Sequence, residues 1–343
     1  MTRILAIARE LGFHRAAIVP VEPVRRHALY TSWLAAGHAG EMTYLAAPAH
    51  VTPRADLHAV LASAKTLVVV ALAYDRTDPI PTAALVGRIA RYARGDDYHL
   101  VMRDRLVALA DRIAAELGRP VATRPCVDTA PILEREWAER AGLGFVAKNT
   151  MVIAPGLGSY IVLGELLVDA ELEVTPVVEQ KPRCGTCRAC LDACPTQAFV
   201  DAYVLDARKC ISYLTIEYEG VIPRELRRAI GTWIFGCDVC QEVCPFNAGV
   251  GEPADPALRP RSIDHALPDL VALGNTGDAA AIPALVELLA NPYPLVRLHA
   301  VWALGELGAS AELAAAHDDD PDVAAELVSA RETAATPRTP RST

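Results

Sequence analysis

The feature that most constrains this chain is a run of four cysteines closed by a proline. Cys184, Cys187, Cys190 and Cys194 follow the spacing C-x2-C-x2-C-x3-C, and Pro195 comes next. Thiolates at this spacing surround a [4Fe–4S] cluster, because the short loops turn the backbone around the cubane and the proline directs the fourth cysteine away from it. In runs of this kind the fourth cysteine binds a different cluster, so a second set of thiolates is required.

A second cysteine run supplies that set. Cys237, Cys240 and Cys244 precede Pro245, and Cys210 is the nearby upstream candidate for the missing thiolate. The ferredoxin pattern therefore predicts two ligand sets: Cys184, Cys187, Cys190 and Cys244 for one cluster, and Cys194, Cys210, Cys237 and Cys240 for the other. Structural zinc and disulfides are the alternatives, but zinc needs no paired C-P motif and disulfides are typical of short secreted chains.

Length and charge limit the remaining possibilities. With 343 residues, the chain can form two or three domains with sizeable cores. No apolar run approaches membrane-spanning length, and Arg9 and Glu10 interrupt the first apolar stretch, which predicts an amphipathic helix and not a signal peptide. We therefore expect a cytoplasmic protein without a membrane partner. The formal charge of −9 gives no general attraction to nucleic acid, so such a partner would need a local basic patch.

The first third of the chain predicts helices and one buried strand. Residues 1–65 are expected to be helical, residues 66–73 to form the strand and residues 74–81 a polar loop. Residues 87–99 crowd arginines and tyrosines around a glycine, just before a helix predicted for residues 100–117. This segment is either a binding loop for an anionic or aromatic ligand or a solvated helix start, and the local sequence leaves both open.

A strand-to-helix turn carries Asp128. The strand begins at Val121, and the following helix is predicted for residues 132–141. Asp128 or Thr129 could be the N-cap of that helix. Alternatively, Asp128 could point into a crevice at the end of the strand and act in catalysis. Cys126 lies outside both cysteine runs, and we expect it to be a buried small hydrophobe.

Glycines punctuate residues 142–165, where two short strands are expected. Glycines at this density allow a backbone to approach a large flat ligand closely. Lys148 and Asn149 could meet amide or phosphate groups of such a ligand. Neither the dinucleotide-binding fingerprint nor the P-loop fingerprint occurs in the chain.

The C-terminal third predicts a linker, paired helices and a tail. Residues 249–260 are rich in proline and glycine, which is typical of a linker. Residues 281–290 and 294–308 have the apolar spacing of a HEAT-type helix pair, with proline before the second helix. One or two such repeats cannot form a solenoid, so the pair is expected to pack on the main body. Residues 331–343 are expected to be disordered.

Several stretches together resemble the epoxyqueuosine reductase family, iron–sulfur and cobalamin enzymes that end queuosine synthesis on tRNA. The matching stretches are residues 91–93, 97–99, 127–131, 139–144, 148–150, the first cysteine run, 210–217 and 236–247. They fall within about residues 50–310, which include the HEAT pair of longer family members. Two residues depart from the family pattern: Ala147 stands where glycine is expected, and Cys126 is not part of the motif.

The resemblance implies an α+β fold in three parts. Residues 1–180 would form a nitroreductase-like cobalamin-binding domain, residues 181–248 a ferredoxin-like domain with two [4Fe–4S] clusters, and residues 249–330 a HEAT-like helical repeat domain. The cofactor-binding residues that it implies are Arg54, Asp128, Lys148, Asn149, Thr150, Ser159, Ser212 and Asp238. The cobalamin would be base-off. The absence of the Asp-x-His-x-x-Gly signature agrees with this, since no glycine follows His99 at that spacing.

The implied reaction is a two-electron, two-proton deoxygenation of an epoxide to an alkene. The clusters would pass electrons singly from an external donor to the corrin. Asp128 would protonate the departing oxygen as the general acid, and desolvation against the apolar corrin face would favour its neutral form. Ser212 and Tyr213 could line the pocket where cluster, corrin and base meet.

The substrate would be the anticodon loop of a tRNA, whose modified base can be splayed into a pocket. Candidate phosphate contacts are Arg224, Arg227, Arg228, Arg259, Arg261 and Arg297, each of which could instead belong to a solvated face. We expect a monomer. The alternatives are a small-molecule corrinoid enzyme related to reductive dehalogenases, and a ferredoxin-type electron-transfer protein.

Overall fold

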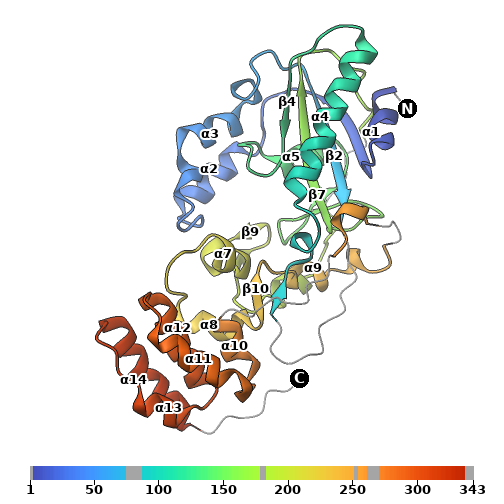
Figure 1. Ribbon diagram of the computed structural model, residues 1–343. Helices are drawn as coiled ribbons and strands as arrows, with labels where there is room; N and C mark the ends of the chain where they lie inside the picture. The colour runs from blue at the N-terminus through green and yellow to red at the C-terminus, as the bar shows by residue number, and fades with distance from the viewer. Residues whose placement is uncertain (1–2, 75–86, 178–182, 251–253, 261–269, 337–343) are drawn as a thin grey trace. The chain divides into compact units, whose positions relative to one another are not determined.

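The computed structural model describes residues 3–74, 87–177, 183–250, 254–260 and 270–336 (Figure 1). The chain divides into two compact units, each of which gathers segments that are distant in the sequence. Unit 1 contains residues 1–78, 91–210 and 238–262, and unit 2 contains residues 79–90, 211–237 and 263–343. Residues 211–237, which include the first cysteine of the second run, therefore belong with the C-terminal helices.

A four-stranded antiparallel sheet is the centre of unit 1. Its order is β1 (Arg15–Pro20), β2 (Thr66–Ala73), β7 (Ile161–Val168) and β4 (Thr123–Cys126). All eight residues of β2 are buried, as expected for a continuous apolar run in the middle of a sheet. The prediction of this strand is confirmed. The prediction that residues 1–65 are helical is wrong at β1, because pairing with β2 stabilises a short apolar segment whose local pattern is ambiguous.

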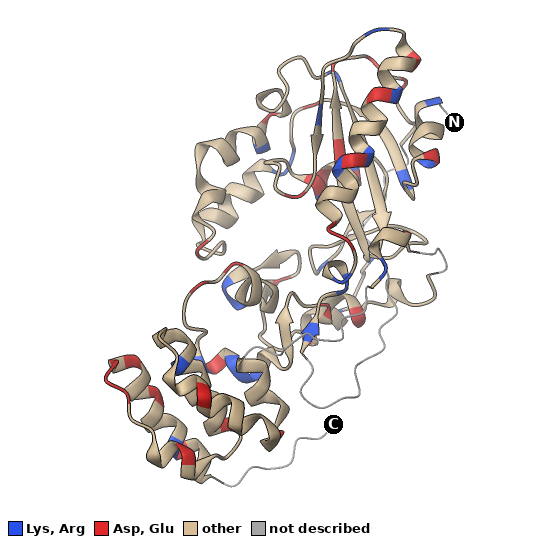
Figure 2. Ribbon diagram, in the orientation of Figure 1, with Lys and Arg blue, Asp and Glu red and all other residues tan. Residues whose placement is uncertain are grey.

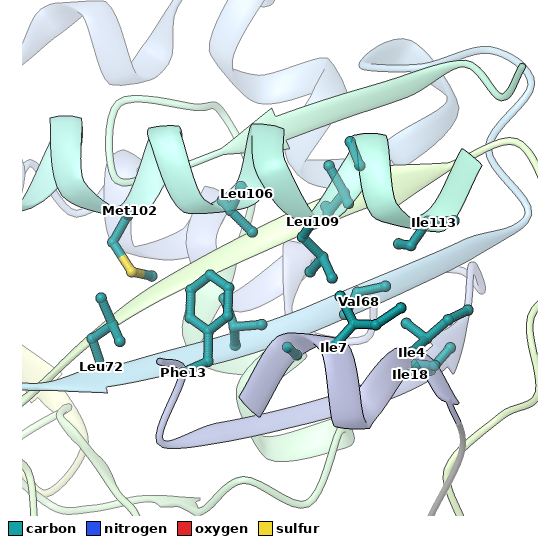
Figure 3. Packing of buried hydrophobic residues seen from close by; sticks show 14 of the residues in the cluster. Ile4, Ile7, Phe13, Ile18, Val68, Leu72, Met102, Leu106, Leu109 and Ile113 are labelled. Carbon is teal, nitrogen blue, oxygen red and sulfur yellow. The ribbon is translucent and has the colours of Figure 1, made fainter. Parts of the chain in front are cut away.

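Helices cover both faces of this sheet. On one face, α1 (Arg3–Glu10) and α4 (Tyr98–Leu117) enclose a core that includes Leu106 and Leu109 of α4 and Val68 of β2 (Figure 3). On the other face, α5 (Glu134–Arg140) packs the fully buried Trp137 against the sheet. Burying a large aromatic or aliphatic side chain stabilises the fold by roughly 1.5–3 kcal/mol. These contacts hold the end of β4 and the start of α4 in place, and the candidate site is built there.

The remaining elements of unit 1 are short. They are α2 (His27–Ala35), α3 (Pro48–Ala55), β5 (Phe145–Val146), β6 (Val152–Ile153), α6 (Ala189–Asp192), β8 (Phe199–Asp201), β9 (Val204–Leu205), α9 (Val239–Glu242) and 3-10 turns at Thr43–Ala46, Leu57–Ala59, Arg91–Ala93, Ala207–Lys209, Pro245–Asn247 and Pro256–Leu258. The two short strands predicted in the glycine-punctuated segment correspond to β5 and β6, which pair antiparallel. The two cysteine runs lie mostly in turns beside α6 and α9.

Unit 2 is built around one buried helix. α12 (Pro294–Glu306) buries Trp302 and packs against α10 (Leu270–Thr276) and α14 (Pro321–Ala335). The other elements are β3 (Arg88–Ile89), α7 (Ile211–Ile216), α8 (Arg224–Ile230), β10 (Trp233–Phe235), α11 (Ile282–Glu287), α13 (Ser310–Ala315) and 3-10 turns at Ala279–Ala281 and Leu288–Ala290. The predicted HEAT-type pair is present as α11 with its following turn and α12.

Two predictions about the C-terminal third are wrong in part. The expected linker is anchored to unit 1 near its end: the Asp255 N–H donates to the carbonyl of Ala73 at 2.8 Å, and the Asp255 carboxylate accepts two hydrogen bonds from Arg105 at 2.6 and 3.0 Å. Leu258 joins the core of this unit. The expected disordered tail is helical as far as Ala335, where α14 ends. Local composition did not predict the order in either segment, because that order comes from long-range contacts.

None of the helices in the described ranges combines the length and apolar character that crossing a membrane requires. Most of the predicted polar loop at residues 74–81, and residues 337–343 of the tail, lie outside the described residues.

Candidate functional site

Asp128 occupies the turn between β4 and α5 in a left-handed backbone conformation, with φ of 46°. This conformation is uncommon for residues other than glycine, although aspartate tolerates it better than most. The main-chain N–H of Asp128 donates a 2.6 Å hydrogen bond to Oε1 of Glu134. The helix begins at Glu134, its N-cap is Leu133, and no side chain caps it. The interpretation of Asp128 or Thr129 as the N-cap is therefore wrong, and the Asp128 carboxylate is available for other interactions.

The start of α4 lies beside this turn. Nε2 of His99 is 3.2 Å from Oδ2 of Asp128, and Nδ1 of His99 is 2.7 Å from Oδ1 of Asp97. Asp97 also accepts the His99 N–H at 2.9 Å and so caps α4. The two readings of this segment are thus compatible: it starts a helix, and it contributes side chains to a site.

Burial and neighbouring charges shift the pKa values of His99 and Tyr98. Burial alone would lower the pKa of His99, but hydrogen bonds with Asp97 and Asp128 outweigh it and raise that pKa. The ring of Tyr98 stacks on His99 with centroids 4.0 Å apart. Burial, followed by the negative charges of Asp128 and Glu134, raises the pKa of Tyr98, so its hydroxyl stays protonated. The sequence places His99 and Tyr98 in a possible binding loop but assigns neither an individual role. Their proximity to Asp128 depends on the tertiary structure.

A cavity of about 450 Å³ adjoins Asp128. Its wall combines cationic, apolar and polar side chains: His99, Leu100, Arg103, Val107, Arg124, Pro125, Val127, Thr129, Ala130 and Pro131. Arg103 and Arg124 are both exposed. A hollow of this kind can receive a group that is partly apolar and carries negative charge.

Four of the predicted cluster ligands lie close enough to affect one another. Burial raises the pKa of Cys190, and the negative charges of Cys244, Cys184 and Cys187 raise it further. Cys184 and Cys244 both pack against a small core of Phe145, Ala147 and Ile153. Ala147, which stands where glycine is expected, therefore belongs to the small core on which two predicted ligands of the first cluster pack.

The other four predicted cluster ligands come from both units. Sγ of Cys194 accepts the N–H of Ala198 at 3.3 Å, an interaction that stabilises a thiolate. Cys210 follows the 3-10 turn Ala207–Lys209 in unit 1, whereas Cys237 belongs to unit 2. All nine cysteines are free thiols, so none forms a disulfide. Cys126 is buried as expected, and burial raises its pKa to about 12.

Lys148 and Asn149 hold the cysteine loops. The Lys148 ammonium donates to the carbonyls of Gly185 and Cys187 at 2.7 and 2.8 Å. Nδ2 of Asn149, which is almost fully buried, donates to the carbonyl of Cys240 at 3.2 Å. These bonds fasten the segment between β5 and β6 to both cysteine runs. Thr150 has φ of 65°, and its carbonyl accepts a bond from Arg135.

Ser159 lies in a buried hydrogen-bond network. Its hydroxyl oxygen accepts from Nε2 of Gln241 at 3.1 Å and from Nδ2 of Asn247 at 2.9 Å, and its N–H donates to Oδ1 of Asn247 at 2.7 Å. A Cβ atom on Gly158 would lie 2.2 Å from Oδ1 of Asn247, so only glycine fits there. The network joins the glycine-punctuated segment to the second cysteine run.

Asp238 is almost fully buried and retains one oxygen that has no hydrogen-bond partner within the described residues. Its other oxygen accepts from the main-chain N–H and the guanidinium of Arg91 at 2.9 and 3.0 Å. Burial raises the pKa of Asp238, and the interactions with Arg91 oppose that rise. The structure therefore leaves a buried acceptor oxygen at this position.

The last two predicted cofactor residues lie in different units. Arg54 is buried in unit 1, donates to the carbonyl of His50 at 3.0 Å and lies 5.2 Å from the ring centroid of Tyr30. Ser212 lies in the first turn of α7 in unit 2 and is half-buried.

The arginines suggested as phosphate contacts mostly form ion pairs inside unit 2. The pairs are Arg224–Glu326 at 2.6 Å, Arg227–Glu326 at 3.0 Å, Arg228–Glu306 at 2.8 Å and Arg297–Asp318 at 2.6 Å. Figure 2 shows basic and acidic positions together on the C-terminal helices. These four cations stabilise helix packing. Arg259 is exposed, and Arg261 lies outside the described residues.

Comparison with protein families identifies three segments. A 4Fe-4S double cluster binding domain matches residues 183–247, the family described as Epoxyqueuosine reductase QueG, DUF1730 matches residues 54–129, and HEAT repeats match residues 270–332. These matches confirm the predictions of two [4Fe–4S] clusters and of HEAT-type helices.

Individual proteins match over most of the chain. Epoxyqueuosine reductase from Pseudomonas aeruginosa is 42% identical over 88% of this chain and 92% of its own length. A crystal structure of epoxyqueuosine reductase with an epoxyqueuosine-modified tRNA-Tyr stem loop has 30% identity and a TM-score of 0.85, covering 97% of this chain and 98% of that one. A structure from Bacillus subtilis, described as having its aspartate catalytic loop swung out of the active site, has 29% identity and a TM-score of 0.84, covering 96% and 97%.

Proposed function

This chain belongs to the epoxyqueuosine reductase family, and we propose that it reduces epoxyqueuosine to queuosine in the anticodon loop of tRNA. The observation that carries this conclusion is the match to the Pseudomonas aeruginosa enzyme, which extends through the cluster segment and the aspartate turn. Neither of the alternatives, a small-molecule dehalogenase or a carrier of electrons alone, is favoured by relatives of this kind.

The reaction needs two electrons and two protons. The epoxide carbon–oxygen bonds break, an alkene forms, and the oxygen leaves as water. Each [4Fe–4S] cluster passes one electron at a time, so the double cluster domain can deliver both electrons in sequence from an external donor. The grouping of Cys184, Cys187, Cys190 and Cys244 supports the proposed ligand set of the first cluster.

Cobalamin is the second proposed cofactor, and the polar groups of the predicted cofactor-binding residues fit it in part. When bound, it supplies a metal centre that can collect two electrons and engage the strained ring. The free buried oxygen of Asp238 suits an amide N–H of a corrin side chain. Lys148, Asn149 and Ser159 would act indirectly, because their polar groups hold the cysteine runs. The antiparallel sheet with helices on both faces supports the nitroreductase-like, α+β assignment.

Asp128 is the proposed general acid, and His99 is its proton partner. Both protons go to the same oxygen. If Asp128 delivers both, it must be reprotonated between the two transfers. Nε2 of His99 lies within hydrogen-bond reach of Asp128, and the raised pKa of His99 favours a proton on that nitrogen. Asp97 fixes the orientation of the ring from its other side.

The tRNA contacts are proposed at the cavity beside Asp128. Arg103 and Arg124 line it, and their guanidinium groups can meet phosphates that flank the modified nucleotide. Leu100 and Val107 supply apolar contact area in the same wall. We propose that the protein acts as a monomer.

The experiment that tests this function uses anaerobically prepared holoenzyme, a chemical reductant and a tRNA stem loop that carries epoxyqueuosine. Nucleoside analysis after digestion should show conversion of epoxyqueuosine to queuosine that depends on both enzyme and reductant. Intact epoxyqueuosine with fully loaded enzyme would contradict the proposal.

A further inference from the structure

The hydrogen bond between the Asp128 N–H and Glu134 closes a seven-residue loop at the catalytic turn. A non-glycine residue keeps left-handed φ values when neighbouring groups hold it there. Glu134 is the group placed to do so, since its carboxylate accepts the N–H of the residue whose φ is 46°. The direction of the Asp128 side chain follows from that main-chain conformation.

Glu134 has charged or titratable neighbours on several elements around it. Asp128 lies in its own loop, Tyr98 on α4, Arg135 on α5, Arg54 on α3 and Glu165 on β7. Burial, followed by the negative charge of Asp128, raises the pKa of Glu134 to about 7, and the two arginines oppose that rise. Its charge therefore changes near neutral pH.

Glu165 on β7 carries a second carboxyl group, which interacts with that of Glu134. It is 0% exposed, it is paired in register with Cys126 across the sheet, and neither of its oxygens has a hydrogen-bond partner among the described residues. Burial, with the negative charge of Glu134, raises its pKa. A partly buried carboxyl group and a fully buried one that interact in this way disfavour simultaneous ionisation.

We propose that Glu134 is a positioning residue for proton donation: its carboxyl oxygen holds the main chain of Asp128 so that the Asp128 side chain faces His99. This inference rests on the proposed function for its kinetic consequences, but the hydrogen bond can be tested without turnover. Glu134 contacts the peptide group of Asp128 and not the reacting atoms, so it acts through Asp128.

Two substitutions test separately whether the acceptor oxygen or the negative charge of Glu134 matters. Glu134→Gln keeps an oxygen that can accept the Asp128 N–H, whereas Glu134→Met keeps approximate volume and removes the acceptor. Displacement of a catalytic group by about 1 Å can cost on the order of a hundredfold in rate. We therefore expect Glu134→Met to lower kcat by about that factor with KM for the stem loop unchanged. Glu134→Gln should retain kcat within about threefold and lose the limb of the kcat–pH profile near pH 7 that Glu134 contributes.

Glu136 provides a matched control on the same helix. It is buried, and its carboxylate accepts the main-chain N–H groups of Arg25 and Arg26 at 2.7 and 2.8 Å, so it anchors a different loop in the same manner. Glu136→Met should lower Tm without the selective loss of kcat. Equal kcat losses in the two Met variants, or wild-type kcat in Glu134→Met, would overturn the proposal.

Hydrogen exchange gives a readout that does not require activity. In holoenzyme, the amide of Asp128 should exchange faster in Glu134→Met than in wild type, and at the wild-type rate in Glu134→Gln and Glu136→Met. Unchanged protection in Glu134→Met would refute the hydrogen-bond role even if the enzyme were active. If wild-type holoenzyme failed to convert epoxyqueuosine while the exchange pattern held, the proposed function would fail and the positioning contact would stand.

Discussion

Nε2 of His99 lies 3.2 Å from the carboxylate of Asp128, although 29 positions separate the two residues in the sequence. Nδ1 of the same ring is 2.7 Å from Asp97, so the imidazole lies between two carboxylates. Such an arrangement favours protonated imidazole and directs one N–H to each carboxylate. In the proposed mechanism, His99 can therefore replace the proton that Asp128 gives up, because the two side chains are already in contact.

Asp128→Asn should abolish most of the activity. The amide preserves shape and hydrogen bonding to His99 but carries no transferable proton, and loss of a positioned proton donor typically costs about a hundred- to ten-thousand-fold in rate. Conversion of the modified stem loop by enzyme with matched cluster content measures this loss. Turnover near wild type would assign the proton to another acid or to water.

Glu165→Gln should increase stability in a pH-dependent manner. The pKa of Glu165 is raised in the folded state, so the native protein must keep this carboxyl group neutral while the unfolded chain ionises it above about pH 4.3. The wild type therefore loses stability as pH rises from that value towards the folded-state pKa, and the glutamine variant does not. Denaturant unfolding at pH 4 and pH 8 should show a larger difference at pH 8. A difference independent of pH would contradict a neutral Glu165.

The anaerobic protein should contain about eight irons and eight acid-labile sulfides, as two [4Fe–4S] clusters require. Cys210→Ser should lower the occupancy of the second cluster and leave about four irons per chain in the first. Cys126→Ala is the control, because this buried thiol lies outside both runs, and its iron content should equal that of wild type. Stoichiometric zinc without sulfide would refute the cluster assignment.

Arg103→Gln and Arg124→Gln should each weaken binding of the tRNA stem loop. Each should also make the binding constant less dependent on salt concentration. Each phosphate contact removed lowers the slope of log K against log salt concentration by roughly 0.7 for single-stranded nucleic acid. Titrations at several salt concentrations measure the slope. Arg228→Gln is the control, since Arg228 is paired with the buried Glu306 and its loss should reduce stability and leave the slope unchanged. The reverse pattern would place the RNA on the C-terminal helices.

The buried sheet strand and the cysteine spacing were predictable because both patterns are local. A continuous apolar run predicts Thr66–Ala73 wherever its partners lie, and the intervals within Cys184–Cys194 are set by the size of the cluster that the loop surrounds. The HEAT-type helices were predictable for the same reason, since their apolar period is contained within each segment. In these cases the sequence by itself determined the element.

The tertiary structure alone decided which charged groups meet. Composition could not pair Arg228 with Glu306 or anchor Asp255 on Arg105, because these contacts join segments that are distant in the chain. The same holds for Asp128: its local sequence favoured a helix cap, yet folding brings Glu134 to its N–H and His99 to its carboxylate. Interaction between charged groups depends on their distance and burial, and both are fixed only when the sheet and its helices pack.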